Sequence, residues 1–444
     1  MSATDVLVIG AGPAGLAAVV ELARLGLTSQ LVEQRDQVGG AIYRRHAGAG
    51  SHVLLLPESH RRRRDALLQS YAAAQTRVTP LMSSVFVGVD QDQRFLIDNR
   101  ALGCVQSVRP RAVILAVGTV EQVLPREGWE LPGVVTAGGM QVQFKETGQA
   151  PQGRVLLAGS GPLLLALAAQ LAAAGNPPLA VLERAQPLAS AWWQAGAVLQ
   201  VLRSWPHVQE AALYARELWR ARVPYLTGWQ VQSVQPAAEG LVVQACHSSG
   251  VTRQYQVQHV ALHDGLLHNN TGLPACAQSD QRLVVHAGDC REVLGAGAAI
   301  DDGRRAAQQV ARHLGQRCDS AVLEQALARA QRTQNALAQL FHAAPFTPTA
   351  NAVVCRCEGL RRSDFDQLQV AASAHEMRLS GRFGMGACQG RFCAHHLSEL
   401  AHQRGIDFDP GALNGDVPRW PLRPVALTAL AAYAEPEGDA PCAA

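Results

Sequence analysis

The hydrophobic pattern of the chain changes its period twice within the first 33 residues. Val6 to Ile9 form an unbroken apolar run, which is typical of a strand buried on both faces of a parallel sheet. From Leu16 to Leu25 the apolar positions follow a helical period, and Gly26 ends that pattern. A second short strand, Ser29 to Val32, ends on Glu33. The pattern therefore predicts a strand–helix–strand unit of an α/β fold.

The turn between the first strand and the helix indicates a dinucleotide site. Gly10, Gly12 and Gly15 have the spacing GxGxxG, and Glu33 follows 23 residues after Gly10 (33 minus 10). The glycines permit the turn, the close approach of a pyrophosphate and tight helix–strand packing, and the acid can accept from a ribose hydroxyl. The start of the helix offers free N–H groups to the phosphates. A glycine-rich turn in an unrelated α/β domain is the alternative.

Other glycine-rich strand ends extend this predicted site. Gly39 and Gly40 would let the backbone run close to a bound cofactor, and a buried strand after Arg111 ends at Gly118. A later strand, Leu283 to His286, leads to Gly-Asp and then to a Gly/Ala-rich helix start. The complete set of predicted cofactor-binding residues is Gly10, Gly12, Pro13, Ala14, Gly15, Glu33, Gln34, Gly39, Gly40, Gly118, Gly288, Asp289, Gly295 and Ala296.

The opening pattern recurs imperfectly in the middle of the chain. A strand from Arg154 reaches Gly159 and Gly161, and a helix and a short strand that ends on Glu183 follow. The third glycine position holds Leu164, whose side chain would weaken a phosphate cradle. We therefore interpret this second site as degenerate or as a site for another nucleotide, with NAD(P)H binding as the alternative.

Composition narrows the partners and the location. The 444 residues are 48% apolar and 17% charged with a net charge of +3, so no broad field for nucleic acid is present. Neither a leader before the first strand nor an apolar run long enough for a bilayer is evident, and we expect a cytoplasmic protein without a transmembrane segment. The basic run from Arg61 to Arg64 is interpreted as a solvated segment, with an anionic ligand or an acidic partner as the alternative.

A region of predicted helices, residues 190–220, is rich in tryptophan. We interpret its aromatic side chains as core and interdomain packing, and a surface for a partner protein is the alternative. The residues are Trp192, Trp193, Trp205 and Trp219.

A cysteine constellation follows a proline-marked linker near the carboxyl end. Cys355 and Cys357 form CxC, 30 residues intervene, and Cys388 and Cys393 form CxxxxC. Four thiolates in two pairs suit an iron–sulfur cluster or zinc. The spacing differs from the CxxC knuckle common in structural zinc sites, which favours [2Fe–2S], while zinc and unligated thiols stay open.

Taken together, these motifs resemble two known modules. The glycine turn with Glu33, the Gly118-Thr119 strand end and the Gly288-Asp289 motif resemble the two-dinucleotide-domain flavoprotein disulfide reductase superfamily. The cysteine pattern resembles the bacterioferritin-associated-ferredoxin-like (BFD-like) [2Fe–2S] module. The combination is similar to the FAD-binding subunits of heteromeric opine oxidases, D-hydroxyproline dehydrogenases and hydrogen cyanide synthases. No CxxC follows the first helix region, so disulfide reductase chemistry is not expected.

The resemblance implies an α/β fold of two Rossmann-like three-layer domains, the second inserted in the first, and a small helical [2Fe–2S] domain. FAD would bind the first domain, residues 1–125 and 263–344, and residues 126–262 would form the inserted, degenerate NAD(P)-type domain. The BFD-like domain would cover residues 350–400, with its cluster on Cys355, Cys357, Cys388 and Cys393, and residues 401–444 would form a C-terminal tail.

The same resemblance implies a division of labour between chains. Substrate oxidation would occur on a D-amino-acid-oxidase-like (DAAO-like) β subunit with FMN or FAD in or near it, and a small third ferredoxin-like subunit is a further expectation. This chain would pass electrons to an acceptor such as a quinone, which allows a peripheral location at the inner face of the cell membrane. Alternatives are a stand-alone NAD(P)H-dependent FAD/[2Fe–2S] reductase and a non-catalytic redox-sensing or scaffold subunit. Catalytic residues are not identified by the sequence.

Overall fold

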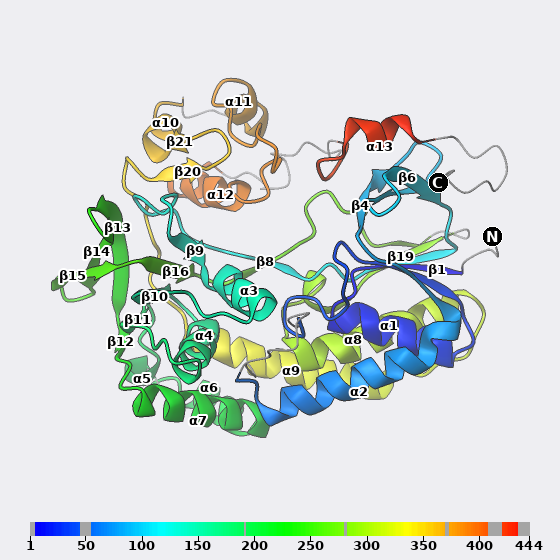
Figure 1. The fold of residues 1–444 in the computed structure, drawn as a ribbon, viewed down its shortest axis with the longest axis horizontal. Coiled ribbons are helices and arrows are strands. Elements are labelled where there is room, and N and C mark those ends of the chain that lie inside the picture. Colours follow the sequence, from blue (N-terminus) through cyan, green and yellow to red (C-terminus); the bar gives the residue numbers. More distant parts are fainter. Residues whose placement is uncertain are drawn as a thin grey trace.

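The computed structural model describes residues 5–44, 55–190, 192–278, 282–368, 373–406 and 420–433. Two sheets dominate the fold, each covered by helices on one face and by a small antiparallel sheet on the other (Figure 1). A small module of short helices follows them and lies at the top of Figure 1.

The first sheet combines strands from the beginning of the chain with strands that follow the second sheet in the sequence. Its strand order is β18-β19-β7-β1-β2-β3, and all its pairs are parallel except β18 with β19. The strands are β1 (Val6–Ile9), β2 (Ser29–Val32), β3 (Val78–Leu81), β7 (Ala112–Leu115), β18 (Ala277–Gln278) and β19 (Leu283–His286). The helices are α1 (Pro13–Arg24), α2 (Glu58–Ala74), η1 (Gln75–Arg77), η2 (Gly288–Cys290), α8 (Ala296–His313) and α9 (Ala321–Leu340).

Strand β1 explains why an unbroken apolar run is needed at the start of the chain. Val6 and Val8 pack with α1 and α8 on one face of the sheet. Leu7 and Ile9 point to the other face, where they meet the small sheet formed by β4 (Ser84–Val89), β5 (Phe95–Asn99) and β6 (Cys104–Val108). Because both faces are covered, each residue of the strand is buried.

The second sheet repeats this architecture in the middle of the chain. Its order is β12-β11-β10-β16-β9, with all pairs parallel, and the antiparallel β13-β14-β15 sheet covers one face. The strands are β9 (Val134–Thr136), β10 (Val155–Gly159), β11 (Ala180–Glu183), β12 (Tyr225–Thr227), β13 (Trp229–Ala237), β14 (Gly240–His247), β15 (Thr252–Val257) and β16 (His259–His263). The helices are α3 (Ala137–Thr147), α4 (Pro162–Ala173), α5 (Pro187–Ser190), α6 (Ala195–Leu202) and α7 (Trp205–Arg220). A two-stranded crossover, β8 (Thr119–Glu121) with β17 (Leu266–His268), joins the two sheets.

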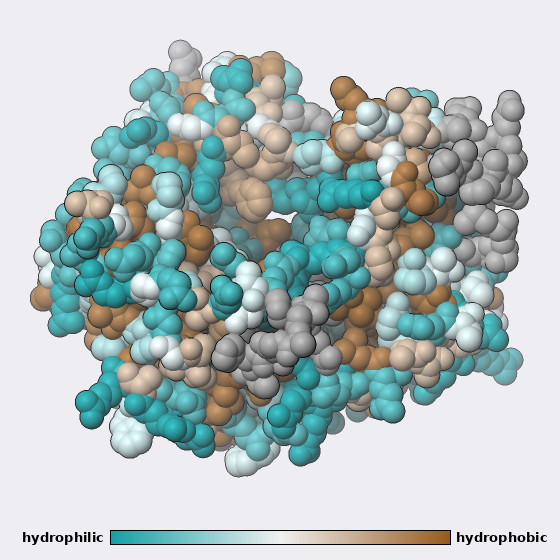
Figure 2. Space-filling model, in the orientation of Figure 1, coloured by the Kyte–Doolittle hydropathy of each residue, from teal (hydrophilic) through white to brown (hydrophobic). Residues whose placement is uncertain are grey.

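The C-terminal module surrounds its own small apolar core. Its elements are β20 (Val353–Cys355), β21 (Leu360–Arg361), α10 (Arg362–Asp366), α11 (Ala374–Leu379) and α12 (Ala394–Gln403). Beyond it, α13 (Leu427–Ala431) packs on the β4-β5-β6 sheet through Ala429. Figure 2 shows an opening near the centre of this face, between the module above and the helical layers below.

The predicted α/β fold with two Rossmann-like units is confirmed, but the interpretation of the tryptophans as packing residues is wrong. Trp192, Trp193, Trp205 and Trp219 are 64 to 80% exposed. Residues that α6 does bury, such as Ala197, pack against α9 instead. Hydrophobic type alone does not assign a side chain to the interior. Among the described helices, none is both long enough and apolar enough to cross a bilayer.

Candidate cofactor sites

The first glycine turn forms a cradle in which Gly10, Gly15 and the nearby Gly40 have no room for a side chain. Gly10 has φ +103°, and a Cβ on it would lie 2.4 Å from the Ala116 carbonyl oxygen. A Cβ on Gly15 would lie 1.8 Å from the Gly10 oxygen, and one on Gly40 would lie 2.9 Å from the Gly12 Cα. The backbone of β1, α1 and the Gly39–Gly40 turn therefore meets at distances that only glycine permits, as a pyrophosphate cradle requires.

Glu33 lies at the end of β2 beside this cradle. Its buried carboxylate accepts the Ala11 N–H at 2.9 Å and the Arg35 N–H at 3.2 Å. Gln34 follows on the exposed side. Pro13 occupies the first turn of α1, where its missing N–H costs no intrahelical hydrogen bond.

Residues that follow β19, late in the α/β region, lie next to the same glycine cradle. A Cβ on Gly288 would lie 2.6 Å from the Ala14 Cβ, so η2 lies directly against the start of α1. Asp289 accepts the Leu294 and Gly295 N–H groups at 3.2 and 3.3 Å and thereby holds the loop before α8, and burial raises the pKa of its carboxyl.

Two more of the predicted residues have simple places in this arrangement. Ala296 begins α8 and is buried against α1. Gly118 follows β7 with φ +70°, and its carbonyl accepts the Asn269 N–H at 3.2 Å. The structure thus brings the predicted residues of both α/β segments together around the carboxyl ends of β1 and β7.

Sequence patterns missed two side chains that position this site. Lys145 is buried on α3 and donates to the Ala41 and Ile42 carbonyls at 3.0 and 3.1 Å, which fixes the turn after Gly40. Burial lowers the pKa of Lys145 to about 8. Asp302, buried on α8, accepts the Gly288 N–H at 2.7 Å. Neither residue belongs to a motif, so no spacing in the sequence singles them out.

Lys145→Met is expected to weaken binding of the predicted FAD about tenfold and to lower the free energy of unfolding by about 2–4 kcal/mol. The reason is that two buried carbonyls lose a charged donor. Fluorescence titration of flavin and urea unfolding measure the two effects. Gln143→Met, at an exposed position of the same helix, is the matched control, and equal behaviour of the two variants would contradict a positioning role.

The second glycine turn is engaged by the chain itself. The Ser160 N–H donates to the His263 carbonyl at 2.6 Å, and the Gly161 N–H donates to Glu183 at 3.0 Å. Burial raises the pKa of Glu183. Leu164, at the third glycine position, is fully buried in the apolar layer between the sheet and α3, α4 and α7.

Residues 341–346, which follow α9, lie across the carboxyl ends of this second sheet. The Ser160 hydroxyl donates to the Phe341 carbonyl at 3.0 Å, and Arg184 donates to the Ala344 carbonyl at 2.7 Å. In doubly wound sheets this edge is where nucleotides bind. The chain's own linker therefore occupies the edge where a pyridine nucleotide would be expected.

A buried ion network holds the linker in place. Arg126 and Arg184 pair with Asp264 at 2.7 and 3.3 Å, and the ring of Phe346 lies 5.1 and 5.5 Å from the two guanidinium groups. Burial acts to raise the pKa of Asp264, but the two cations outweigh it and hold the pKa below its usual value.

The four cysteines of the C-terminal module come together as two pairs. Cys355 and Cys393 share a hydrogen bond, and so do Cys357 and Cys388. The Gly384 N–H donates to both sulfurs of the first pair. Within the described ranges, no group of three or more His, Cys, Asp or Glu side chains is placed to hold a metal ion.

The paired thiols differ in their readiness to ionise. The hydrogen bond from Cys393 lowers the pKa of Cys355 to about 6 and raises the pKa of Cys393 itself, while burial raises the pKa of Cys357. A Cβ on Gly386 would lie 2.3 Å from the Cys357 Cβ, so the backbone passes directly beside the second pair. Thiolate, rather than thiol, is the metal ligand.

The module is attached to the crossover region between the two sheets. The Trp129 indole donates to the Val353 carbonyl at 2.7 Å, and the Arg356 guanidinium lies 5.1 Å from the Trp129 ring. His396 is buried on α12 with a hydrogen bond to the Val123 backbone, and burial lowers its pKa to about 4. The cysteines are thus fixed relative to the segment that joins both sheets.

Comparison with known proteins gives consistent matches. Residues 4–322 match the family model described as pyridine nucleotide-disulphide oxidoreductase. The chain is 30% identical to one of the subunits of opine oxidase from Rhizobium meliloti, over 98% of this chain and 100% of the relative. It is also 30% identical to hydrogen cyanide synthase subunit HcnB of Pseudomonas protegens, over 96% and 97% of the two chains. The fold is similar to that of L-proline dehydrogenase from P. horikoshii, with a TM-score of 0.66, 17% identity and coverage of 97% and 79% of the two chains.

Proposed function

The chain belongs to the pyridine nucleotide-disulphide oxidoreductase family, and we propose that it is the electron-transfer subunit of a heteromeric amino-acid, opine or amine dehydrogenase. Membership makes it a flavoprotein oxidoreductase of the FAD-dependent class. Its donors in the proposed complex carry CH–NH or CH–NH2 groups, its cofactors are FAD and a [2Fe–2S] cluster, and a partner protein oxidises the substrate.

The observation that carries this proposal is the covered edge of the second sheet. Ser160 and Arg184, which flank a pyridine-nucleotide site in the Rossmann arrangement, hydrogen-bond to the Phe341 and Ala344 carbonyls instead. A member of this family whose second site is filled by its own linker needs another source of electrons. This favours a partner protein over the stand-alone NAD(P)H-dependent reductase.

The residues of the first site fit FAD. An added Cβ at Gly10, Gly15 or Gly40 would collide with backbone of the cradle, and Glu33 lies beside it for a ribose hydroxyl. Asp289 and the loop before α8 would face the sugar chain and the flavin. FAD, when bound, exchanges electrons singly or in pairs. The chain's residues bind and orient it and, with Lys145, keep the turn after Gly40 fixed.

The donor set of the C-terminal module fits a binuclear cluster. Two pairs of thiols are what two iron ions require, and a single zinc ion would need its ligands gathered around one point. Cys355, Cys357, Cys388 and Cys393 would hold the cluster, which carries one electron at a time. Gly384, whose N–H reaches two of the sulfurs, would tune its potential.

The proposed partner is a DAAO-like flavoprotein β subunit with FMN or FAD in or near it, and a small ferredoxin-like third subunit is part of the same proposal. Two relatives are themselves named as subunits, of an opine oxidase and of a hydrogen cyanide synthase. The exposed tryptophans of this chain supply aromatic area of the kind enriched at protein interfaces. A quinone acceptor would place the complex in the cytoplasm at the inner face of the cell membrane.

Isolation of the native complex tests this function. We expect the complex, but not this chain alone, to reduce an artificial acceptor with an opine or a cyclic or D-amino acid as donor. Turnover of such a donor by the isolated FAD-loaded chain would contradict the assignment. A complex that keeps full turnover after loss of this chain would instead support the scaffold alternative.

A further inference from the structure

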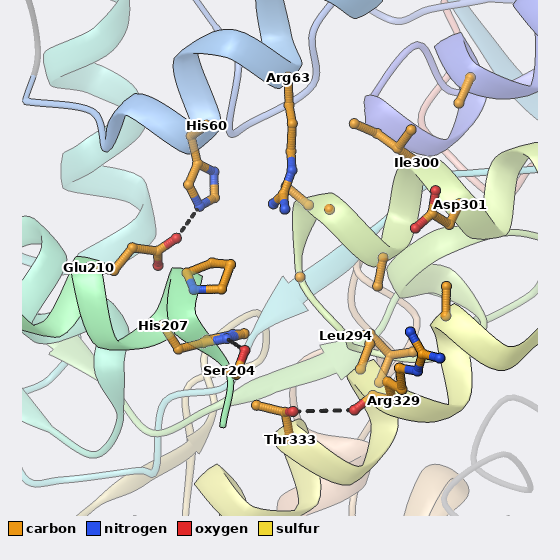
Figure 3. Close-up of a pocket in the computed structure, with 18 of the residues that line it drawn as sticks. His60, Arg63, Ser204, His207, Glu210, Leu294, Ile300, Asp301, Arg329 and Thr333 are labelled. Atoms are coloured by element: carbon orange, nitrogen blue, oxygen red, sulfur yellow. Dashed lines mark hydrogen bonds and ion pairs between the residues drawn. The ribbon is translucent and has the colours of Figure 1, made fainter. Parts of the chain in front are cut away.

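We propose that a second ligand site lies between α2, α8, α9 and the start of α7, and that it binds a small polyanion carrying two or more phosphate groups. A cavity of 1140 Å³ opens there, lined by side chains from all four helices (Figure 3). Small-molecule sites in proteins typically measure about 300–1000 Å³. The space is therefore large enough for a nucleotide-sized ligand.

The side chains that line the cavity carry an excess of positive charge. Its two acidic side chains are engaged: Glu210 with His60 at 2.7 Å, and Asp301 with Arg304 at 3.4 Å. In the part of the chain that the structure describes, four other lining guanidinium groups have no carboxylate at ion-pair distance. They belong to Arg63, Arg203, Arg329 and Arg332. All four residues are exposed to solvent, and four cations that line one space favour an anion in it.

Arg63, an exposed side chain that also interacts electrostatically with Asp301, lies where an anion would bind. A Cβ on Gly297 would lie 2.7 Å from the Arg63 Nη1 atom, so the guanidinium lies against bare backbone in the first turn of α8. The amino end of this 18-residue helix carries a partial positive charge, and a cation beside it is unfavourable. Figure 3 shows Arg63 extended from α2 into the space between α7 and α8. An anion between the two would satisfy both.

This site is separate from the proposed cofactor sites. It shares the turn and loop residues Ile42, Leu294, Gly295 and Ala296 with the flavin end. Its unpaired arginines lie on α2, directly after α6 and on α9. The cysteine module lies on the opposite side of the molecule from α2, α7 and α9 (Figure 1).

Guanidinium groups and the shape of the site together favour phosphate. The planar fork of arginine donates two parallel hydrogen bonds to phosphate oxygens, and each phosphate offers more charge and more acceptors than a carboxylate. The cations come from both halves of the α/β region: from α2 and α9 in the first, and from Arg203, directly after α6, in the second. A ligand with several phosphates would connect the two halves of the chain.

Calorimetric titration of the FAD-saturated chain with inorganic tripolyphosphate tests the proposal. Saturation with FAD removes the glycine cradle as a competing phosphate site. We expect binding that weakens with added salt, that falls about tenfold in Arg63→Gln and in Arg329→Gln, and that is largely kept in Arg63→Lys. Arg62→Gln, at a position paired with Glu58 on the same helix and outside the cavity, should bind as the unchanged chain does.

Three results would overturn the proposal. They are failure of the unchanged chain to bind tripolyphosphate at low ionic strength, equal affinity in Arg63→Gln and Arg62→Gln, and equal affinity for citrate and tripolyphosphate. Flavin content and thermal unfolding of each variant separate loss of this site from loss of the fold. Failure of the proposed function would appear as missing flavin in the unchanged chain. Failure of this proposal would appear as missing tripolyphosphate binding in a chain that holds its flavin.

Discussion

Cys355→Ala is expected to remove the iron signal of the protein and to lower turnover of the complex at least about 100-fold. Cys355 is buried and pairs with Cys393, whose hydrogen bond lowers the pKa of Cys355 to about 6, so neutral pH favours the thiolate form that binds metal. Alanine removes the ligand without adding a polar atom to the apolar core of the module. Iron analysis, the paramagnetic signal after anaerobic reduction and donor-to-acceptor turnover measure the effect.

The matched control for this variant is Cys318→Ser, because Cys318 lies outside the C-terminal module and is only partly buried. It should keep the iron, the signal and the turnover of the unchanged protein. Flavin content should be unchanged in both variants. Cys355→Ala with full iron content and full turnover would show that this cysteine is not a ligand.

Gly15→Ala is expected to abolish FAD binding and to lower the free energy of unfolding by about 3 kcal/mol. The added methyl group would lie 1.8 Å from the Gly10 carbonyl oxygen, and backbone cannot move aside as a flexible side chain can. The start of α1 must shift away from β1, which opens the cradle and disturbs packing with α8. Flavin absorbance after purification and urea unfolding measure the two effects.

Gly196→Ala provides the comparison for a glycine that needs no such freedom. A Cβ at Gly196 meets no other atom within 4 Å, and the position lies within α6. We expect unchanged flavin content and a gain in stability of about 0.4–1 kcal/mol. Normal flavin content in Gly15→Ala would refute the proposed pyrophosphate cradle.

Local patterns predicted much of the fold because the spacing of apolar residues in the sequence matches the positions that its strands and helices bury. The run from Val6 to Ile9 is apolar throughout since β1 is covered on both faces. Gly10 and Gly15 could be assigned to the cofactor turn from the sequence, because the backbone contacts that exclude a side chain there are made by residues that lie close together in the motif or at the end of a buried strand. The repeat around Gly159 and the paired cysteines are recognisable in the same way.

Contacts between distant segments could not be predicted from such patterns. Lys145 reaches the turn after Gly40 from a helix about a hundred residues later, and the linker beyond α9 reaches Ser160 from further still. In the sequence Arg63 is one member of a basic run, and only the packing of four helices distinguishes it from Arg62. These side chains meet their partners only in the folded chain, so no characteristic spacing in the sequence identifies them.

The central claim is that this member of its family does not take electrons from a pyridine nucleotide, because residues 341–346 cover the second site. Anaerobic mixing of the isolated FAD-loaded chain with NADH or NADPH, followed by the flavin absorbance in a stopped-flow instrument, tests it most directly. We predict that the flavin band stays unchanged with either nucleotide and bleaches with dithionite. Bleaching by NADH or NADPH within seconds would contradict the claim.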